Sequence, residues 1–271
     1  MSSASAAVSF QNDTPELASA YERAGVVQFN HGQVLIERLR IAPGERVLDV
    51  GAGTGRLAAY VAELVGPTGE VVGIDPLGHR IAIAQSRTGG NVRFATGQAE
   101  DLSAFADSHF DVVYLNSVLH WIADKPRALA EAFRVLKPGG RIGLNTKDPS
   151  KPHEIRGFLQ EALADVGLAG RRRDPQGGSD GTALQALLEA AGFRVGTSDL
   201  HTIVDFHDDV DALLTWSESS AFGNFLSGFS PAERARIRDA LAVRLESRRT
   251  PDGLRLERYL RFATAVKPAA R

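Results

Sequence analysis

The sequence predicts a doubly wound α/β fold, in which helices cover both faces of a mostly parallel sheet. Short apolar runs alternate with helical patterns from Arg46 to Asn145, and parallel strands joined by crossover helices produce this alternation. A glycine-rich turn, Gly51–Gly55, directly follows the first apolar run, where an open α/β sheet presents its ligand site. The length of 271 residues fits one such domain with insertions.

Composition restricts the class of protein. The chain is 43% hydrophobic and 24% charged, and its 31 basic and 33 acidic residues give a net charge of −2. This balance provides no attraction to nucleic acid or to an anionic membrane, so we expect a small-molecule partner and a monomer or homodimer. The absence of cysteine excludes thiolate nucleophiles and cysteine-based metal sites. We expect a cytoplasmic protein, because the N-terminus does not resemble a signal peptide and no apolar run could span a bilayer.

Two helices are predicted before the sheet. Thr14 followed by Pro15 is typical of a helix start, with an N-capping threonine and a proline at the first helical position. This helix should run to about Arg23. A second helix is predicted from about Asn30 to Arg40, because its apolar residues fall near one face.

The strand and helix alternation of the sheet occupies residues 41–150. The first two apolar runs and the helix between them form a βαβ unit, and the pattern then continues. The predicted strands are Arg46–Val50, Glu70–Asp75, Asn91–Ala95, Phe110–Asn116 and Arg141–Asn145, and the predicted helices span Arg56–Leu64, about 77–86 and about 125–135.

The pattern becomes looser after Asn145. Helices are predicted at about Pro152–Val166 and at Thr182–Ala191, and a strand at about 193–204. Three helical stretches follow, the last of which begins at a capping box, Ser230–Glu233, with proline at its first helical position. A closing strand is predicted at about 254–266.

The motif that carries the chemistry is the D-x-G-x-G-x-G segment Asp49–Gly55. Its glycines keep the turn tight and let a ligand approach the backbone, next to the unpaired N–H groups of a helix start. Asp75 ends the second strand, where a carboxylate can accept from both hydroxyls of a ribose. Arg56 occupies the place of the last glycine in the G-x-G-x-x-G of NAD enzymes, so the pattern favours an adenosyl ligand. The alternative is that the glycines only form a turn and Asp75 only caps a helix.

These motifs resemble those of the class I S-adenosylmethionine-dependent methyltransferases, over about residues 45–145. Beyond the glycine motif and Asp75, the similar segments are Gly97–Leu102, Phe110–Val113 and Arg134–Gly140. The resemblance implies a seven-stranded Rossmann-like sheet with an antiparallel last strand, S-adenosyl-L-methionine as cofactor and S-adenosyl-L-homocysteine as product. It divides the chain into N-terminal lid helices (1–40), a cofactor-binding core (41–150) and a remainder (151–271) that completes the sheet and adds cap insertions at about 151–180 and 207–250.

The resemblance also implies cofactor roles. Asp49 and Gly51 would face the methionine moiety, and Asp75 the ribose. Gln98 stands where most relatives have Asp, and its amide oxygen can still accept from the adenine amino group. Asn116 would lie under the sulfonium or, alternatively, act only as a turn residue. The expected cofactor-binding residues are Asp49, Gly51, Ala52, Gly53, Gly55, Asp75, Pro76, Gln98, Ala99 and Asn116, with Tyr21 and Gln28 from a lid that alternatively only packs.

His120 and Trp121 are the expected catalytic residues. They directly follow the fourth strand, and similar stretches occur in methyltransferases of small carboxylic acids, such as the trans-aconitate and juvenile hormone acid enzymes. His120 would act as a base or position the acceptor, and Trp121 would form a wall beside it. The alternative is that both residues only pack against the next helix.

Other aromatic and charged residues have two interpretations each. Aromatic residues in the last third of the chain either line an apolar acceptor pocket or belong to a core, and Arg171–Arg173 either binds an anion or is solvated. The other histidines form no helical i,i+4 pair of metal ligands, so we expect no metal, and surface or loop positions for them. The aromatic residues are Trp216, Phe222, Phe225 and Phe229, and the histidines are His31, His79, His109, His153, His201 and His207.

The expected reaction is methyl transfer to an oxygen of a small-molecule acceptor, either a carboxylate or a hydroxyl, by in-line displacement. An N- or C-methyltransferase of a specialised metabolite is the enzymatic alternative. A cofactor-binding homologue without turnover is the non-enzymatic alternative.

Overall fold

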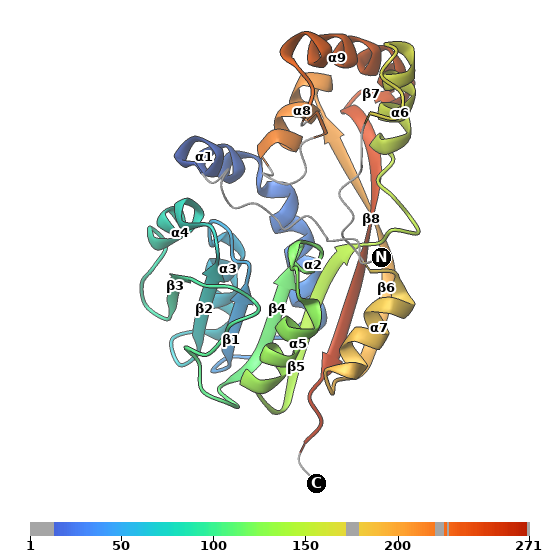
Figure 1. The fold of residues 1–271 in the computed structure, drawn as a ribbon. Coiled ribbons are helices and arrows are strands. Elements are labelled where there is room, and N and C mark those ends of the chain that lie inside the picture. The colour runs from blue at the N-terminus through green and yellow to red at the C-terminus, as the bar shows by residue number, and fades with distance from the viewer. Residues whose placement is uncertain (1–13, 172–178, 220–224, 227, 270–271) are drawn as a thin grey trace.

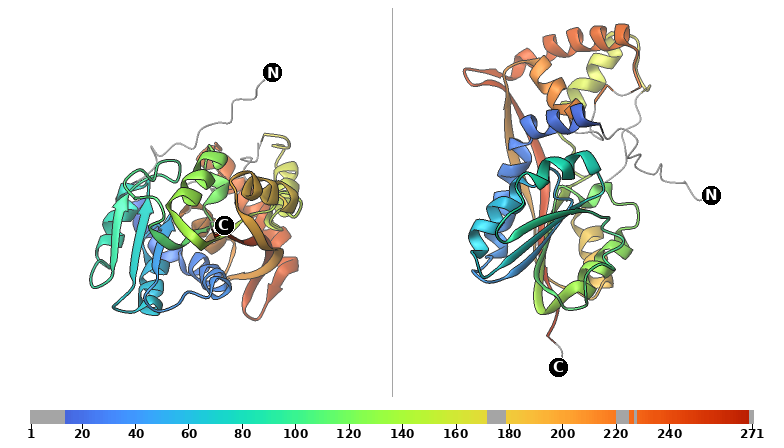
Figure 2. Two further views of the ribbon diagram at one scale, coloured as in Figure 1. Left: turned by 90° about the horizontal axis from the view of Figure 1, so that it is seen from below. Right: turned by 90° about the vertical axis from the view of Figure 1, so that its left-hand side faces the viewer.

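The computed structural model describes residues 14–171, 179–219, 225, 226 and 228–269. These residues form a twisted sheet with helices on both faces, and a helical cap stands above one end of it (Figures 1 and 2). The doubly wound α/β fold predicted from the sequence is thereby confirmed. Within the described ranges, no helix is long and apolar enough to cross a membrane.

The sheet has the strand order β3-β2-β1-β4-β5-β8-β6, with the short β7 paired to β8. The first five strands in this order are parallel, and β8 is antiparallel to both of its neighbours. The order reverses between β1 and β4, and an open α/β sheet binds ligands at such a switch point. The strands are β1 Arg46–Val50, β2 Glu70–Asp75, β3 Val92–Thr96, β4 Phe110–Asn116, β5 Leu136–Lys147, β6 Arg194–His207, β7 Arg249–Thr250 and β8 Gly253–Val266.

Two hydrophobic cores hold the helices against the sheet. One core places α2, α3 and α4 on one face, with Leu35, Leu57 and Ile81 buried. The other core places α5 and α7 on the opposite face, with Leu129 and Leu184 fully buried, and Figure 2 shows these two layers. The helices are α1 Pro15–Ala24, α2 Val26–Leu39, α3 Arg56–Val65, α4 Gly78–Gln85, α5 Lys125–Val135, α6 Ile155–Asp165, α7 Gly181–Ala190, α8 Val210–Ser219 and α9 Pro231–Leu245, and there are 3₁₀ turns η2 Leu119–Trp121 and η3 Glu246–Arg248.

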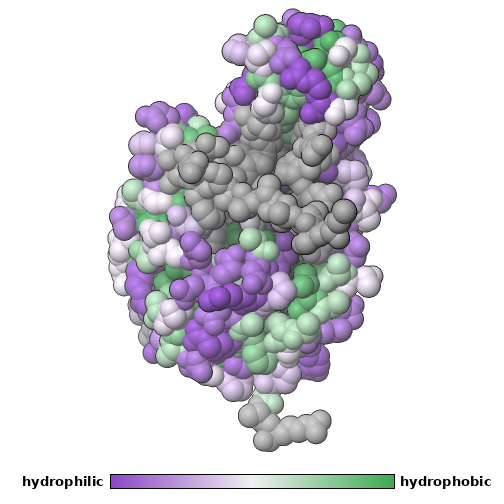
Figure 3. Space-filling model, viewed as in Figure 1, coloured by the Kyte–Doolittle hydropathy of each residue, from purple (hydrophilic) through white to green (hydrophobic). Residues whose placement is uncertain are grey.

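The cap is built on the parts of β6 and β8 that extend beyond the sheet. β5 pairs with β8 only from Leu260 onward, whereas β6 pairs with β8 from Leu254. The part of the β6–β8 pair that does not pair with β5 packs against α6, α8 and α9. A third core, which includes Leu159, Leu213 and Leu241, joins these elements. Figure 3 shows the cap as a separate lobe with a mixed polar and apolar surface.

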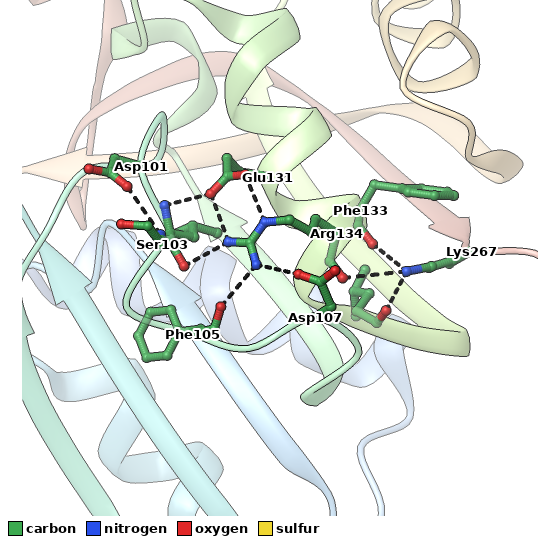
Figure 4. A network of polar contacts seen from close by, with 10 residues as sticks. Asp101, Ser103, Phe105, Asp107, Glu131, Phe133, Arg134 and Lys267 are labelled. Atoms are coloured by element: carbon green, nitrogen blue, oxygen red, sulfur yellow. Dashed lines mark hydrogen bonds and ion pairs between the residues drawn. The ribbon is translucent and has the colours of Figure 1, made fainter.

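Arg134 fastens the loop between β3 and β4 to α5 (Figure 4). Its guanidinium donates to the carbonyl oxygens of Leu102 and Phe105 at 2.8 and 2.9 Å, and it also binds Asp107 and Glu131. Because these bonds tie a loop without regular structure to a helix, this part of the Arg134–Gly140 motif supports the fold rather than a ligand site.

Several element boundaries differ from those predicted. The second helix begins at Val26, not at about Asn30, because α2 follows α1 after a single residue, Gly25. β5 begins at Leu136 rather than Arg141, because Leu136 pairs with Phe110 across a register shift. β6 continues past residue 204 to His207 because β8 provides a partner strand throughout, which a single-sequence pattern does not reveal.

Candidate active site

The glycine turn has the conformation that the motif predicts. Gly51 and Gly53 have φ angles of +82° and +56°, which residues with side chains rarely adopt. A Cβ on Gly51 would lie 2.2 Å from Val118, and one on Gly53 would lie 3.2 Å from the Tyr21 ring. The glycines therefore allow both the turn and the close approach of neighbouring groups.

Asp75 holds this turn in place. Its carboxylate accepts the N–H of Gly53 at 2.9 Å and the N–H of Leu77 at 2.9 Å, and the residue is 6% exposed. Each carboxylate oxygen has further acceptor capacity, so both a structural role and a ribose role are chemically available to Asp75.

Asp49 is the buried acid of the motif. It lies in β1, is 2% exposed, and burial raises its pKa to about 8. The Tyr114 hydroxyl opposes this rise in the pKa, whereas the nearby negative charge of Asp75 adds to it. In the free protein, Asp49 is therefore largely protonated at neutral pH, and a cation beside it would favour its ionisation.

Helix α1 covers the glycine turn. The Arg80 guanidinium stacks on the Tyr21 ring at 3.8 Å, and Tyr21 in turn lies against Gly53. Glu22 pairs with Arg56 at 2.6 Å and with Arg87 at 2.7 Å. These contacts hold the C-terminal end of α1 against the start of α3, at Arg56, and against the segment after α4, at Arg87.

A cleft lies between helices α1 and α2 and the ends of strands β1 and β4. In the described part of the chain, the Gln28 side-chain oxygen is buried without a hydrogen-bond partner. Asp49, Asn116 and Arg56 also line the cleft, which therefore offers both hydrogen-bond acceptors and donors. A ligand with a positive charge and hydroxyl groups, such as S-adenosylmethionine, fits this donor and acceptor pattern. The cleft brings together six of the expected cofactor residues, namely Tyr21, Gln28, Asp49, Gly51, Ala52 and Asn116.

Asn116 is held by an amide network at the ends of β4 and β5. It donates to the Gln28 carbonyl oxygen at 2.9 Å and accepts from Asn145 at 2.8 Å. Asn145 is fully buried and also accepts the N–H of Ser117 at 2.6 Å. Asn145 was not predicted as a site residue, although its place at the end of a strand beside β4 could have indicated it.

Three more of the expected cofactor residues, Pro76, Gln98 and Ala99, do not line this cleft. Pro76 is half-buried in the turn after Asp75, Gln98 is exposed, and Ala99 is 8% exposed and packs in a core. The loop that carries Gln98 is fixed beside β2 because Gly97 donates to the Asp75 carbonyl oxygen at 3.1 Å. This loop therefore lies next to the turn that contains Pro76, outside the cleft.

His120 and Trp121 form the turn η2 after β4. His120 is 7% exposed, its Nδ1 lies 3.4 Å from the Thr146 hydroxyl, and its ring centre lies 4.8 Å from that of Trp121. The Lys147 ammonium lies 4.6 Å from the centre of the Trp121 ring. Burial and the charges of Lys147 and Lys125 hold the pKa of His120 well below 6.5, so its imidazole is neutral at pH 7. Thr146 and Lys147 were not identified from the sequence.

Two of the histidines expected at surface or loop positions lie in the interior, so that prediction was wrong for His31 and His207, whereas His153 lies in the loop before α6 and is half-buried. His31 is 2% exposed and His207 is 8% exposed, and the Nε2 of His153 is shielded from solvent. His31 and His207 are buried because α2 and β6 meet under the cap. Among the residues that the structure describes, no group of three or more side chains could hold a metal ion.

The aromatic residues of the cap divide between two environments. Phe225 and Phe229 are 8% and 7% exposed and belong to the cap core, as the core interpretation expects. Trp216 is half-buried and lies beside His153 and His207. Phe222 and the second and third arginines of Arg171–Arg173 lie outside the described residues, and Arg171 itself pairs with Glu233.

Part of the chain is similar in sequence to known methyltransferases. Residues 48–144 match a family described as a methyltransferase domain. A ubiquinone/menaquinone biosynthesis C-methyltransferase UbiE from Ectopseudomonas mendocina is 39% identical over 142 residues, which are 50% of this chain and 55% of the relative. The chain therefore spans only about half the length of such relatives.

Two solved structures share the fold. A putative methyltransferase in complex with the Haloferax volcanii Trm112 activator has a TM-score of 0.62 at 18% identity, over 97% of this chain and 99% of the other. A Haemonchus contortus phospholethanolamine N-methyltransferase bound to S-adenosylhomocysteine has a TM-score of 0.58 at 20% identity, over 96% and 60% of the two chains. Residues 48–144 therefore carry the sequence of a methyltransferase domain, and the two solved structures share the fold of the chain.

Proposed function

We propose that the chain transfers a methyl group from S-adenosylmethionine to an oxygen of a small-molecule acceptor. The observation that carries this proposal is that the cleft and His120 meet at the ends of two paired strands, β4 and β5. The Asn116 and Asn145 amides join the cleft to the end of β5, and the next residue, Thr146, contacts His120. The cofactor supplies an electrophilic methyl group when bound, so the remaining task is to orient a nucleophile and exclude water.

Each part of the site has a proposed task. Asp49 and Gln28 would hold the cationic amino acid end of the cofactor, and Asp75 would accept from its ribose. Tyr21 and the pairs made by Glu22 would keep α1 closed over the cleft and thus exclude water. Gln98 and Ala99 remain candidates for the adenine edge, on a loop fixed to β2.

His120 is the proposed group on the acceptor side. Its imidazole is neutral at pH 7, so it can accept a proton from a hydroxyl or a hydrogen bond from an acid. Trp121 would form an apolar wall next to it. The likeness of this segment to enzymes that esterify small carboxylic acids favours a carboxylate or hydroxyl acceptor.

Carbon methylation is the second candidate, because the 39% identical relative is named a C-methyltransferase. The experiment that separates the candidates uses methyl-labelled cofactor with a panel of acids, phenols and amines. Label in a product that mild alkali releases as methanol identifies a methyl ester. Label that resists alkali identifies an ether, amine or carbon product, which mass spectrometry then distinguishes. No transfer to any acceptor, with S-adenosylhomocysteine still bound, would support the non-enzymatic alternative instead.

A further inference from the structure

A cluster of buried hydrogen-bond donors lies where α2, the upper part of β8 and the cap meet. Arg258 of β8 is 8% exposed and binds Asp205 of β6 through Nε and Nη2. Its Nη2 also contacts the Nε2 of His31. Among the described residues, Arg258 Nη1 makes no hydrogen bond, so its two N–H groups remain available for a ligand.

The contacts of two histidines fix which nitrogen of each carries the proton. A guanidinium can only donate, so the Nε2 of His31 accepts and its proton is on Nδ1. The Nδ1 of His153 accepts the N–H of Ile155 at 3.2 Å, so its proton is on Nε2. Burial lowers the pKa of both rings well below 6.5, which keeps them neutral. The two donors are therefore the Nδ1–H of His31 and the Nε2–H of His153. Within the described ranges, neither nitrogen has a hydrogen-bond partner.

These groups surround one indole ring. The Trp216 ring centre lies 6.3 Å from that of His153, 5.6 Å from that of His207 and 5.6 Å from the Arg258 guanidinium carbon. Phe225 lies 6.2 Å from the same ring. The cluster thus combines unsatisfied N–H donors with a flat apolar wall, which is the composition of a site for an amphipathic ligand.

The cluster is close to the proposed methyl-transfer site. His31 lies one turn after Gln28 on α2, and a Cβ on the next residue, Gly32, would lie 3.0 Å from the Asn116 amide nitrogen. The Lys147 ammonium, which stacks on Trp121, also lies near enough to lower the pKa of both His120 and His153. These contacts place the cluster next to the proposed site, near Asn116 and Lys147.

We propose that the donor cluster binds a carboxylate of the methyl acceptor, with the apolar body of the acceptor against Trp216. Asp205 cancels the charge of Arg258 and the histidines are neutral, so the site has donors with little net charge. This suits a monoanionic carboxylate better than a dianionic phosphate. A carboxylate held in this way anchors the molecule, because its lone pairs are engaged, and the reacting atom lies at the other end beside His120. The acceptor is accordingly an acid with a second functional group. This inference rests on the proposed function.

The alternative is that the cluster is only a buried ion pair that supports the junction of α2, β8 and the cap. A purely structural cluster gains nothing from N–H donors that remain without partners, because each such group costs free energy when buried. A ligand that supplies oxygen acceptors removes this cost. The two interpretations differ in whether a carboxylate binds at all.

The test measures binding separately from turnover. The protein, saturated with S-adenosylhomocysteine, is titrated calorimetrically with 3-phenylpropionate, with 3-phenylpropan-1-ol, which has the same body without the carboxylate, and with phenyl phosphate. We expect the acid to bind at least tenfold more tightly than the alcohol and more tightly than the phosphate. Trp216 and Trp121 are the two tryptophans of the chain, so a Trp121→Phe variant lets fluorescence report on Trp216 alone.

Variants locate the site. His153→Phe keeps a ring but removes the N–H donor, and it should weaken the acid at least threefold while leaving the alcohol unchanged. The double variant Arg258→Met/Asp205→Leu removes both charges together, so that neither is left buried alone, and it should abolish the preference for the acid. Arg194→Met removes an exposed guanidinium at the far end of β6 and serves as the matched control, without effect on any ligand.

The outcomes separate this inference from the proposed function. If S-adenosylhomocysteine binds but the acid binds no better than the alcohol, the carboxylate site is wrong and the methyltransferase proposal stands. Tighter binding of phenyl phosphate, or an acid preference that survives in the double variant, would equally overturn it. Failure of S-adenosylhomocysteine to bind would overturn the proposed function itself.

Discussion

The carboxylate of Asp75 accepts the backbone N–H of Gly53 at 2.9 Å, across the turn that the glycine motif forms. The residue expected to bind the ribose is thus also a support of the loop that would face the cofactor. Its role in binding and its role in folding are therefore coupled, and a single substitution affects both.

Asp75→Ala should consequently lower both stability and cofactor affinity. It removes the acceptor for the N–H groups of Gly53 and Leu77, and leaving buried donors unpaired costs about 1–3 kcal/mol of unfolding free energy. S-adenosylhomocysteine should bind at least tenfold more weakly, because the turn loosens and a ribose acceptor is lost. Urea unfolding and calorimetric titration measure the two effects. Asp101→Ala, at an exposed turn carboxylate that accepts from Ser103, is the control; equal effects in both variants would contradict a special role for Asp75.

Asp49 should make cofactor affinity depend on pH. Its pKa of about 8 means that the free protein holds a proton there at pH 7, and a bound ammonium or sulfonium favours the ionised form. Binding of S-adenosylhomocysteine should therefore release protons and tighten from pH 6 to about 8. Calorimetry in buffers of different ionisation enthalpy measures the proton release. Asp49→Asn should remove the part of the release that comes from this carboxyl, and an unchanged release would place the proton elsewhere.

The same carboxyl has a consequence for stability. Its pKa is raised in the folded state, so its stabilising contribution is complete below pH 4 and is lost as the pH rises toward 8. Relative to Asp49→Asn, the wild-type free energy of unfolding should fall over this range. Urea denaturation of both proteins between pH 5 and 8.5, at about half-unit steps, measures the difference. A difference that does not change with pH would mean that Asp49 is ionised in the free protein.

Closure of α1 should depend on Glu22. Its carboxylate pairs with Arg56 and Arg87, so Glu22→Gln weakens the link between the lid and the helices beside the glycine turn. We expect S-adenosylhomocysteine to dissociate several-fold faster, with a change in stability below about 1 kcal/mol because the pair is partly exposed. Stopped-flow displacement measures the dissociation rate. Glu16→Gln, at an exposed position of the same helix, should leave the rate unchanged; equal rates in all three proteins would mean that α1 is not a lid.

The sequence predicts well what is encoded locally. The βαβ units and the glycine turn depend on neighbouring residues, and the positive φ angles of Gly51 and Gly53 follow directly from the motif. Asn145 and Arg80 were missed because their contacts, with Asn116 and Tyr21, join segments far apart in the chain. The prediction for His31 failed for the same reason.

The burial of His31 shows which information a single sequence lacks. Its helix, α2, presents that residue to Arg258, which is 227 positions away on β8. A histidine in an amphipathic helix is expected on the polar face of that helix. The Arg258 guanidinium lies opposite His31 because β8 pairs with β6, and a single sequence does not show this pairing. Local patterns therefore predicted the glycine turn and several residues of the cleft beside it, whereas the surroundings of His31 depend on tertiary packing.

The last prediction concerns His120, whose environment changes the expected pH profile. Burial and the charges of Lys147 and Lys125 lower its pKa. The acid limb in the pH profile of kcat/KM should therefore have a midpoint below the usual histidine pKa of about 6.5. At pH values above this midpoint, kcat/KM should not depend on the protonation of His120. At lower pH it should fall, because only the neutral ring accepts a proton. Lys147→Met removes a positive charge and should move the limb toward higher pH.

Substitution of His120 then distinguishes its two possible tasks. If the ring is a base, His120→Ala should lower kcat by about two to four powers of ten and remove the acid limb, with S-adenosylhomocysteine affinity unchanged. If the ring only positions the acceptor, the loss should be smaller and should appear mainly in the acceptor KM. His120→Gln, which keeps a hydrogen-bonding group but cannot act as a base at neutral pH, should recover activity only in the second case. Wild-type kinetics in both variants would assign His120 to packing against Thr146 and Trp121 alone.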